Sequence, residues 1–305
     1  MTNKRSKTKK KRNWWVLAPL ILIGVLLLAV GIYVAYVFNS VKSSVDRDMY
    51  ESVTAIDSSL TEKKVEDKAA INILLLGIDS ESSVTGRSDA LMVMNLKPDT
   101  DEIQLISIPR DTRTSIEGHG EDKINHAHAF GGPDLSIETV EDFLDIEIDY
   151  FARINMEGMA EMVDLVGPIT VDNHLDFSQG GDTFSTGPIT LNGDQTMNYV
   201  RMRKQDPNGD FGRTERQRKV IEGIVREGAN IENVTRIVGF TEILGDNMST
   251  NMRFNDMTKL FQNYRSTLNN FNSYQMQGSG TMIDGIYYYI IPEEEVTNVH
   301  NLIES

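Results

Sequence analysis

The sequence contains no cysteine, although it is 305 residues long. Disulfide bonds and thiolate nucleophiles are therefore excluded, and a chain of this size can form its core without such cross-links. A Walker A loop, a GxSxG nucleophile motif and internal repeats are absent as well. These absences remove the common nucleotide-binding and serine-hydrolase signatures.

Acidic residues are absent from the first 38 positions, so all 45 Asp and Glu residues come later in the chain. Residues 1–13 hold seven Lys or Arg, and residues 14–38 hold no charged residue. A membrane-spanning helix needs about 20 apolar residues, and basic flanks stay in the cytoplasm. The pattern predicts a cytoplasmic basic tail over 1–13 and a transmembrane anchor over 14–38. The protein is then a single-pass protein of the cell membrane with an extracellular catalytic domain.

A cleaved signal peptide is the alternative interpretation of this terminus. Its apolar region usually spans about 7–15 residues and ends in small residues. Here the uncharged run has 25 residues and ends in Tyr, Val and Phe, which favours the anchor. Both interpretations export the rest of the chain. The exported part is strongly acidic, which argues against nucleic acid as a partner.

Beyond the anchor, residues 39–69 are polar and predict a stalk, and residues 70–305 predict one catalytic domain. Short apolar runs predict buried strands, with a turn at 97–101 joining the second and third into a hairpin. The predicted strands are 71–78, 90–96, 103–108, 148–155, 169–171, 188–191, 273–277 and 286–291. The predicted helices are 133–144, 157–166 and 214–230. Strands interspersed with helices indicate an α/β domain, with a mixed central sheet and helices on both faces.

Two aspartates flank the first two predicted strands. Asp79 ends the first strand and Asp89 begins the second. Ligands of α/β proteins often lie at strand ends, and Mg²⁺ is usually held by one or two carboxylates together with phosphate oxygens and water. The two aspartates are therefore a candidate metal site. The alternative is that both cap backbone amides in turns.

Residues 199–218 hold five arginines and one lysine in a protein of net charge −15. Arginine suits bidentate recognition of phosphate, and helix N-termini attract phosphate through free N–H groups. The pattern predicts that Arg201, Arg203 and Arg213 converge on one pyrophosphate. Arg216 and Arg218 lie further along the same predicted helix, where surface positions are the simpler expectation.

A second basic group follows the third predicted strand. Arg110, Asp111 and Arg113 come directly after Pro109, and Lys123 follows ten residues later. An exposed ion pair that pins a loop, and a solvated lysine, are the alternatives to a phosphate site. His126 and His128 lack further evident ligands for zinc, so capping or substrate contact is expected of them instead.

Taken together, these motifs resemble the LytR–CpsA–Psr family of cell-envelope phosphotransferases. The resemblance covers about residues 70–230. Its motifs are NILLLGID at 72–79, GRSD at 86–89, SIPRDTR at 107–113, KINHA at 123–127, FGG at 130–132, YVRMR at 199–203 and GDFGRTERQ at 209–217. Residues 231–305 match no motif.

The resemblance implies an enzyme that moves an anionic glycopolymer, such as wall teichoic acid or capsule, from an undecaprenyl-pyrophosphate carrier to a peptidoglycan acceptor. The product is a phosphodiester link. Asp79 and Asp89 would hold Mg²⁺, or Mn²⁺ in its place. The expected pyrophosphate-binding residues are Arg87, Arg110, Arg113, Lys123, Arg201, Arg203, Arg213 and Gln217. The expected catalytic residues are Arg110, Asp111, Arg201, Arg203 and Arg213.

Two features of this reaction stay open at the sequence level. The base for the acceptor hydroxyl is one of Asp111, Asp206 and Asp210, with arginine pairing the alternative role of each. The polyprenyl tail needs an apolar slot, which Met159, Met162 and Val163 of the helix 157–166 would line; ordinary core packing is the alternative for these side chains.

Two other functions compete with the transferase. One is a lipid-linked pyrophosphatase that uses the same residues and releases its product to water. The other is a non-enzymatic envelope regulator or transcription attenuator, although a cytoplasmic tail of 13 residues argues against direct DNA binding.

Overall fold

The computed structural model describes residues 32, 33, 35, 36, 38–78, 86–228 and 247–305. The chain divides into two compact units, Met1–Ser40 and Val41–Ser305. Within the described residues, none of the helices combines the length and apolar character needed to cross a bilayer. The predicted anchor over 14–38 lies largely outside those residues.

The segment predicted as a stalk differs from that expectation. From Val41 onward it belongs to the same compact unit as the rest of the domain. Met49 of the short π-helix η1 (Val45–Met49) and Val65 of α2 (Ser58–Asp67) are almost fully buried. A few well-placed apolar side chains are therefore enough to bind a mostly polar segment to the domain.

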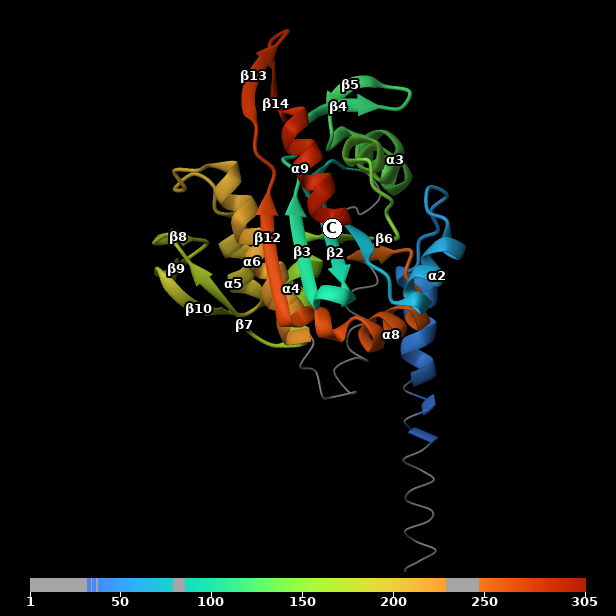
Figure 1. Cartoon of the computed structure of the whole chain (residues 1–305). Coiled ribbons are helices and arrows are strands. Elements are labelled where there is room, and N and C mark those ends of the chain that lie inside the picture. Colours follow the sequence, from blue (N-terminus) through green and yellow to red (C-terminus); the bar gives the residue numbers. More distant parts are fainter. Residues whose placement is uncertain (1–31, 34, 37, 79–85, 229–246) are drawn as a thin grey trace, which may run out of the picture. The chain divides into compact units, whose positions relative to one another are not determined.

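The core of this unit is a mixed sheet, as predicted (Figure 1). β1 runs antiparallel to β2 and parallel to β6, β2 runs antiparallel to β3, and β3 runs parallel to β12. In the described part of the chain the sheet has six strands, in the spatial order β11 (Met248–Thr250), β6 (Tyr150–Asn155), β1 (Ile71–Ile78), β2 (Ser88–Lys97), β3 (Glu102–Ser107) and β12 (Asn270–Gln275). The predicted hairpin between β2 and β3 is confirmed, with η2 (Pro98–Thr100) as its turn.

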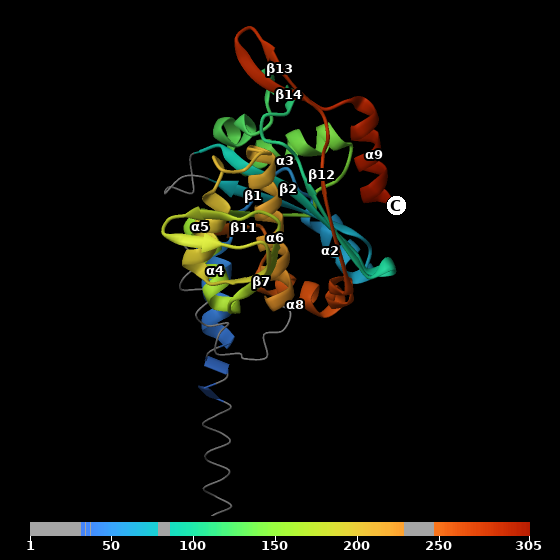
Figure 2. The same cartoon turned by 90° about the vertical axis from the view of Figure 1, so that its left-hand side faces the viewer.

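Helices cover both faces of the sheet, which confirms the predicted layering (Figure 2). Alternate residues of a strand point to opposite faces. Leu74 and Leu76 of β1 therefore pack with α3 (His126–Leu144) and α9 (Glu293–Glu304). Ile73 and Leu75 pack with α2, α6 (Asp210–Gly228) and α8 (Phe254–Asn263). A second apolar cluster joins α4 (Met156–Val166), α5 (Gly193–Arg201) and α6.

Several small hairpins surround the sheet. The pair β4–β5 and the pair β13–β14 stand next to each other beyond one end of the central sheet in both views (Figures 1 and 2). The small strands are β4 (Arg113–Ile116), β5 (Gly120–Lys123), β7 (Ile169–Asn173), β8 (Phe177–Gln179), β9 (Asp182–Phe184), β10 (Gly187–Leu191), β13 (Ser279–Ile283) and β14 (Ile286–Ile290). The remaining described element is η3 (Arg265–Asn269).

Two helices begin earlier than their sequence patterns predict, and in both cases glycine is the reason. α3 starts at His126 and kinks at Gly132, which has a φ of 65°. α6 starts at Asp210 and runs through Gly212, where a Cβ would overlap the Asp206 carboxylate. Gly132 permits the kink, and Gly212 permits close packing against Asp206.

Candidate active site

The predicted charged residues meet at the end of the sheet where β2 begins and β3 ends. Arg110, three residues beyond β3, places Nη1 2.9 Å from Oδ1 of Asp89 on β2. Its Nε lies 3.2 Å from Oδ2 of Asp210, the first residue of α6. Burial lowers the pKa of Arg110, but Asp89, Asp210 and Asp111 together outweigh it, so the net shift is upward. The arginine is therefore held charged at a half-buried position.

Asp210 is the carboxylate around which the arginines gather. Nη2 of Arg213, one turn into α6, lies 2.9 Å from its Oδ1, and Nε of Arg203 lies 3.8 Å from the same oxygen. Together with Arg110, three guanidinium groups surround this one carboxylate. Burial lowers the pKa of Arg213; Asp210 opposes that shift and Arg110 adds to it. This local excess of positive charge at a helix N-terminus suits a bound anion.

Several donors of this cluster lack a hydrogen-bond acceptor although they are buried. They are Nε of Arg110 and both Nε and Nη2 of Arg213. Nε of Arg110 and Nη2 of Arg213 lie in ion-pair contact with Asp210 but do not hydrogen-bond to it, and Oδ1 of Asp210 accepts no hydrogen bond either. A buried charged donor without an acceptor costs about 1–3 kcal/mol or more. A phosphate group would supply the missing acceptors, so the cluster fits the predicted pyrophosphate site.

Lys123 and Asp111 form the wall of the site next to the β4–β5 hairpin. Nζ of Lys123, at the end of β5, donates to Oδ1 of Asp111 at 2.7 Å. Oδ2 of Asp111 lies 3.9 Å from Nε of Arg110. The backbone N–H of Tyr289 on β14 donates to the Asp111 carbonyl at 2.8 Å. The late hairpin is thus fixed to the loop that carries Arg110.

An apolar cavity of about 160 Å³ lies between the sheet and helices α4 and α6. Met159 and Met162 line it, as predicted, whereas Val163 is buried in the second apolar cluster instead. A smaller cavity of about 30 Å³ adjoins it and is lined by Asp89, Arg213 and Gln217. Gln217 borders both cavities. The apolar space therefore leads to the arginine cluster.

Other predicted residues form no ion pair with this cluster within the described part of the chain. Arg87 is exposed just before β2. Nη2 of Arg201 lies 3.5 Å from Oε1 of Glu157 on α4, and Nη1 of Arg113 lies 3.1 Å from Oε2 of Glu121 within the β4–β5 hairpin. Asp79 lies outside the described residues. The structure thus brings together the predicted residues Asp89, Arg110, Asp111, Lys123, Arg203, Arg213 and Gln217.

The expectation that Arg216 and Arg218 lie on the surface is wrong, because both are more than nine-tenths buried. Arg216 pairs with Asp206 and donates to the carbonyl oxygens of Tyr199 and Met202. Arg218 donates to Oγ of Ser107 and Oε1 of Gln275, and so joins α6 to β3 and β12. Asp206 consequently has a structural partner, which leaves Asp111 and Asp210 as base candidates.

His128 holds a position that sequence reasoning did not identify. It is buried, its Nδ1 lies 2.8 Å from the Gly86 carbonyl oxygen, and its Nε2 lies 3.4 Å from Nη1 of Arg153. Burial lowers its pKa, a backbone hydrogen bond to Gly86 opposes this, and Arg153 adds to it. The side chain therefore positions the segment that leads into Asp89, and nothing in its sequence spacing indicates this contact.

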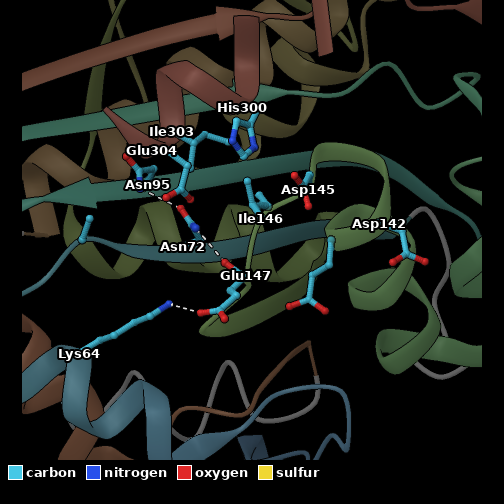
Figure 3. A pocket seen from close by; sticks show the side chains of 12 residues that line it. Lys64, Asn72, Asn95, Asp142, Asp145, Ile146, Glu147, His300, Ile303 and Glu304 are labelled. Carbon is cyan, nitrogen blue, oxygen red and sulfur yellow. Dashed lines mark hydrogen bonds and ion pairs between the residues drawn. The ribbon is translucent and has the colours of Figure 1, made fainter. Parts of the chain in front are cut away.

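A larger cavity of about 850 Å³ lies at the opposite end of β1, between α2, α3 and α9 (Figure 3). Lys64, Asn72 and His300 line it together with five carboxylates, those of Glu141, Asp142, Asp145, Glu147 and Glu304. This excess of negative charge would repel a phosphate. Burial raises the pKa of Glu141, a backbone hydrogen bond from Ile148 opposes this, and neighbouring carboxylates add to it. Size therefore does not identify the anion site in this protein.

Comparisons with known proteins agree with the motif analysis. The model of the LytR_cpsA_psr family matches residues 32–305. The chain is 39% identical over 296 residues to the polyisoprenyl-teichoic acid–peptidoglycan teichoic acid transferase TagU of Bacillus subtilis (strain 168), covering 97% of this chain and 96% of the relative.

Solved structures share the fold. A crystal structure from Enterococcus faecalis, described as a transcriptional regulator, matches with a TM-score of 0.71 and 35% identity, over 79% of this chain and 88% of that one. A structure of TagT bound to LIIa-WTA matches with a TM-score of 0.68 and 29% identity, over 78% and 90% of the two chains.

Proposed function

Because this chain belongs to the LytR_cpsA_psr family, we propose that it transfers a teichoic-acid-type glycopolymer from a polyprenyl-pyrophosphate carrier to peptidoglycan. Its relative TagU is named for transfer of teichoic acid from a polyisoprenyl carrier to peptidoglycan. The observation that carries the proposal is the set of buried N–H groups of Arg110 and Arg213 that make no hydrogen bond, at the edge of an apolar cavity. A lipid pyrophosphate has the anionic group and the apolar chain that this arrangement fits.

In this proposal the polyprenyl chain occupies the cavity between the sheet, α4 and α6, and the pyrophosphate lies against Arg110 and Arg213. The acceptor hydroxyl oxygen attacks the phosphorus that bears the polymer. A new P–O bond forms, and the bond to the bridging oxygen breaks, with its electron pair leaving on the polyprenyl phosphate. Phosphoryl transfer depends mainly on positioning and charge neutralisation, which the arginines provide.

The acceptor proton needs a base, and Asp111 is the proposed one. Its Oδ1 accepts from Nζ of Lys123 at 2.7 Å, and its Oδ2 lies 3.9 Å from Nε of Arg110. Asp210 is less suited, because three guanidinium groups compete for its oxygens. Arg203, which is more than half exposed, would close on the pyrophosphate from the loop before α6. Arg87, Arg113 and Arg201 remain predicted contacts at the edge of the site.

We also propose Mg²⁺ as the metal, with Mn²⁺ as a substitute. Asp89 and Asp79 would hold it, together with pyrophosphate oxygens, and it would neutralise charge on the leaving phosphate. Such a donor set fits Mg²⁺, which takes one or two protein carboxylates at phosphate sites. Among the described residues, no group of three or more His, Asp or Glu side chains is placed to hold a metal.

Replacing Asp89 with asparagine should raise the Mg²⁺ concentration needed for half-maximal activity by about tenfold or more, because one anionic ligand is lost. The measurement is a Mg²⁺ titration of the transfer rate, accompanied by calorimetric titration of Mg²⁺ with a non-reactive pyrophosphate analogue. Asp99→Asn, in the exposed turn at the other end of β2, is the matched control. An unchanged Mg²⁺ requirement in Asp89→Asn would remove Asp89 from the metal site.

The uncharged run at 14–38, preceded by seven basic residues, supports a membrane location with the catalytic domain outside the cell. A carrier lipid fits this location, since the part of its polyprenyl chain that lies outside the cavity would stay in the bilayer. Protease treatment of intact cells lacking their wall should degrade the domain but spare the basic tail.

The transfer assay uses a labelled lipid-linked polymer, soluble peptidoglycan oligomers and Mg²⁺. The expected product carries the label on the oligomer and appears together with polyprenyl phosphate. A lipid-linked pyrophosphatase would instead release the polymer at the same rate with and without oligomers. A non-enzymatic regulator would leave the donor intact.

Filling the apolar cavity should weaken donor binding. Ala152 of β6 lines the cavity, and a phenylalanine there would take the space of several isoprenoid carbons. Each buried CH₂ contributes about 0.8 kcal/mol, so the donor KM should rise by about tenfold or more. Ala70→Phe, in the acidic cavity, is the matched control and should leave the donor KM unchanged. A higher donor KM for Ala70→Phe, with an unchanged donor KM for Ala152→Phe, would assign the lipid to the acidic cavity. Thermal unfolding of both variants checks for overpacking.

A further inference from the structure

The β13–β14 hairpin exposes apolar side chains, although the rest of the domain buries most of its own. Met282, Ile286 and Tyr287 are 62%, 50% and 44% exposed. Met282 and Tyr287 lie directly opposite each other in the hairpin. A Cβ at Gly280 would lie 2.7 Å from Cε2 of Tyr287, so the glycine allows the ring to lie across the neighbouring strand. One side of the ring is thus supported by the hairpin, and the ring remains partly open to solvent.

This hairpin is attached to the active site. Its Tyr289 N–H donates to the Asp111 carbonyl oxygen, and Tyr288 lies beneath the Arg113 guanidinium at 5.9 Å. Nζ of Lys123 lies 5.9 Å from the Tyr287 ring centroid and 2.7 Å from Oδ1 of Asp111. The exposed aromatic surface therefore continues directly from the wall of the charged site.

A chain of contacts connects the apolar cavity with the β13–β14 hairpin. It runs from the cavity through Gln217 and Arg213 to Asp210 and Arg110, and then through Asp111 and Lys123 to the hairpin. In phosphoryl transfer the attacking and leaving oxygens are roughly in line. If the leaving polyprenyl phosphate lies on the cavity side, the attacking hydroxyl must approach from the side of Asp111, Lys123 and the hairpin.

We propose that the β13–β14 hairpin is the docking surface for the glycan strand of the peptidoglycan acceptor, with Tyr287 stacking on a sugar ring. This inference rests on the proposed transferase function. Hexosamine rings present weakly positive C–H faces, which suit the negative face of an aromatic ring. The flanking groups Lys123, Arg113 and Asp122 can contact sugar hydroxyls and amides. The polymer of the donor is bonded to the attacked phosphorus itself and so does not occupy the in-line position.

Tyr287→Ala should raise the KM for soluble peptidoglycan oligomers by about tenfold, because one stacking contact is lost. The kcat at saturating oligomer and the KM for the lipid-linked donor should stay as in the wild type. Tyr287→Phe keeps the ring and should retain the wild-type acceptor KM. A purely structural role of Tyr287 would lower kcat or the melting temperature instead of producing this selective change.

Phe261→Ala is the matched control, since Phe261 is 49% exposed and lies on α8, on the other side of the domain from the hairpin.

The same oligomers are also titrated calorimetrically into the donor-free protein, which tests acceptor binding whether or not transfer occurs. Weaker binding by Tyr287→Ala than by wild type and Phe261→Ala supports the inference. Equal binding by all three proteins, an unchanged acceptor KM, or a rise in donor KM instead would overturn it. Absence of transfer by the wild type would overturn the proposed function, and the binding titration would still decide the role of the hairpin.

Discussion

Replacing Arg110 with alanine should lower kcat/KM for polymer transfer by about a thousandfold, since arginines that neutralise charge in phosphoryl transfer contribute about 10³–10⁵ in rate. Arg110 contacts Asp89 and Asp210 and has a buried Nε without a hydrogen-bond acceptor. The two carboxylates therefore hold the guanidinium group in place, and its Nε–H can donate to the pyrophosphate. Arg110→Lys should also be strongly impaired, because an ammonium group lacks the planar pair of donors. The measurement is the initial rate with labelled donor at several donor concentrations.

The control for this variant is Arg226→Ala, near the end of α6, where the arginine pairs with Glu222 on the helix surface. It should transfer within about twofold of the wild-type rate, as expected for an exposed pair. Circular dichroism and thermal unfolding show whether Arg110→Ala stays folded with Asp89 and Asp210 unpaired. A folded Arg110→Ala protein with wild-type kcat/KM would rule out the proposed pyrophosphate site.

Replacing Arg216 with alanine should lower the free energy of unfolding by about 3–5 kcal/mol, the usual effect of removing one partner of a buried ion pair. Arg216 and Asp206 have side chains only 6% and 5% exposed. The arginine also donates to the carbonyl oxygens of Tyr199 and Met202 and lies 5.4 Å above the Phe177 ring. These contacts hold the loop that carries Arg203. The measurement is urea unfolding followed by circular dichroism.

A second variant separates two causes of the lost stability, the missing packing of the Arg216 side chain and the unpaired charge of Asp206. Arg216→Met combined with Asp206→Leu removes both charges and should recover part of the stability lost in Arg216→Ala, since apolar replacements of buried pairs are often tolerated. Arg226→Ala again serves as the control on the same helix. If Arg216→Ala unfolds at the wild-type urea concentration, Arg216 is not a structural clamp.

Local features of the fold followed from the sequence because they depend on neighbouring residues. The apolar run at 71–78 coincides with β1, and the turn chemistry after Lys97 gives the β2–β3 hairpin. The sequence did not predict which strands from distant parts of the chain pair with each other. The parallel pairing of β12 with β3 joins residues more than 160 positions apart. An apolar run does not encode which strand it pairs with. β13 carries few features of a buried strand, because most of its side chains are exposed.

The charged site shows the same limit. The family resemblance grouped Asp89, Arg110 and Arg213 as site residues, and the structure brings these three side chains together. Spacing did not distinguish Arg213, in the cluster, from Arg201, which pairs with Glu157. It also did not reveal the burial of Arg216, because arginine is seldom buried and its partner Asp206 lies in an irregular loop.

The most direct test of the proposed site is a crystal structure with a non-hydrolysable polyprenyl-pyrophosphate analogue. We expect its phosphates within hydrogen-bond distance of Nε of Arg110 and of Nε and Nη2 of Arg213, with the prenyl chain between Met159, Met162 and the sheet. Density for the pyrophosphate away from these arginines, or for the prenyl chain in the acidic cavity at the opposite end of β1, would contradict the proposed site.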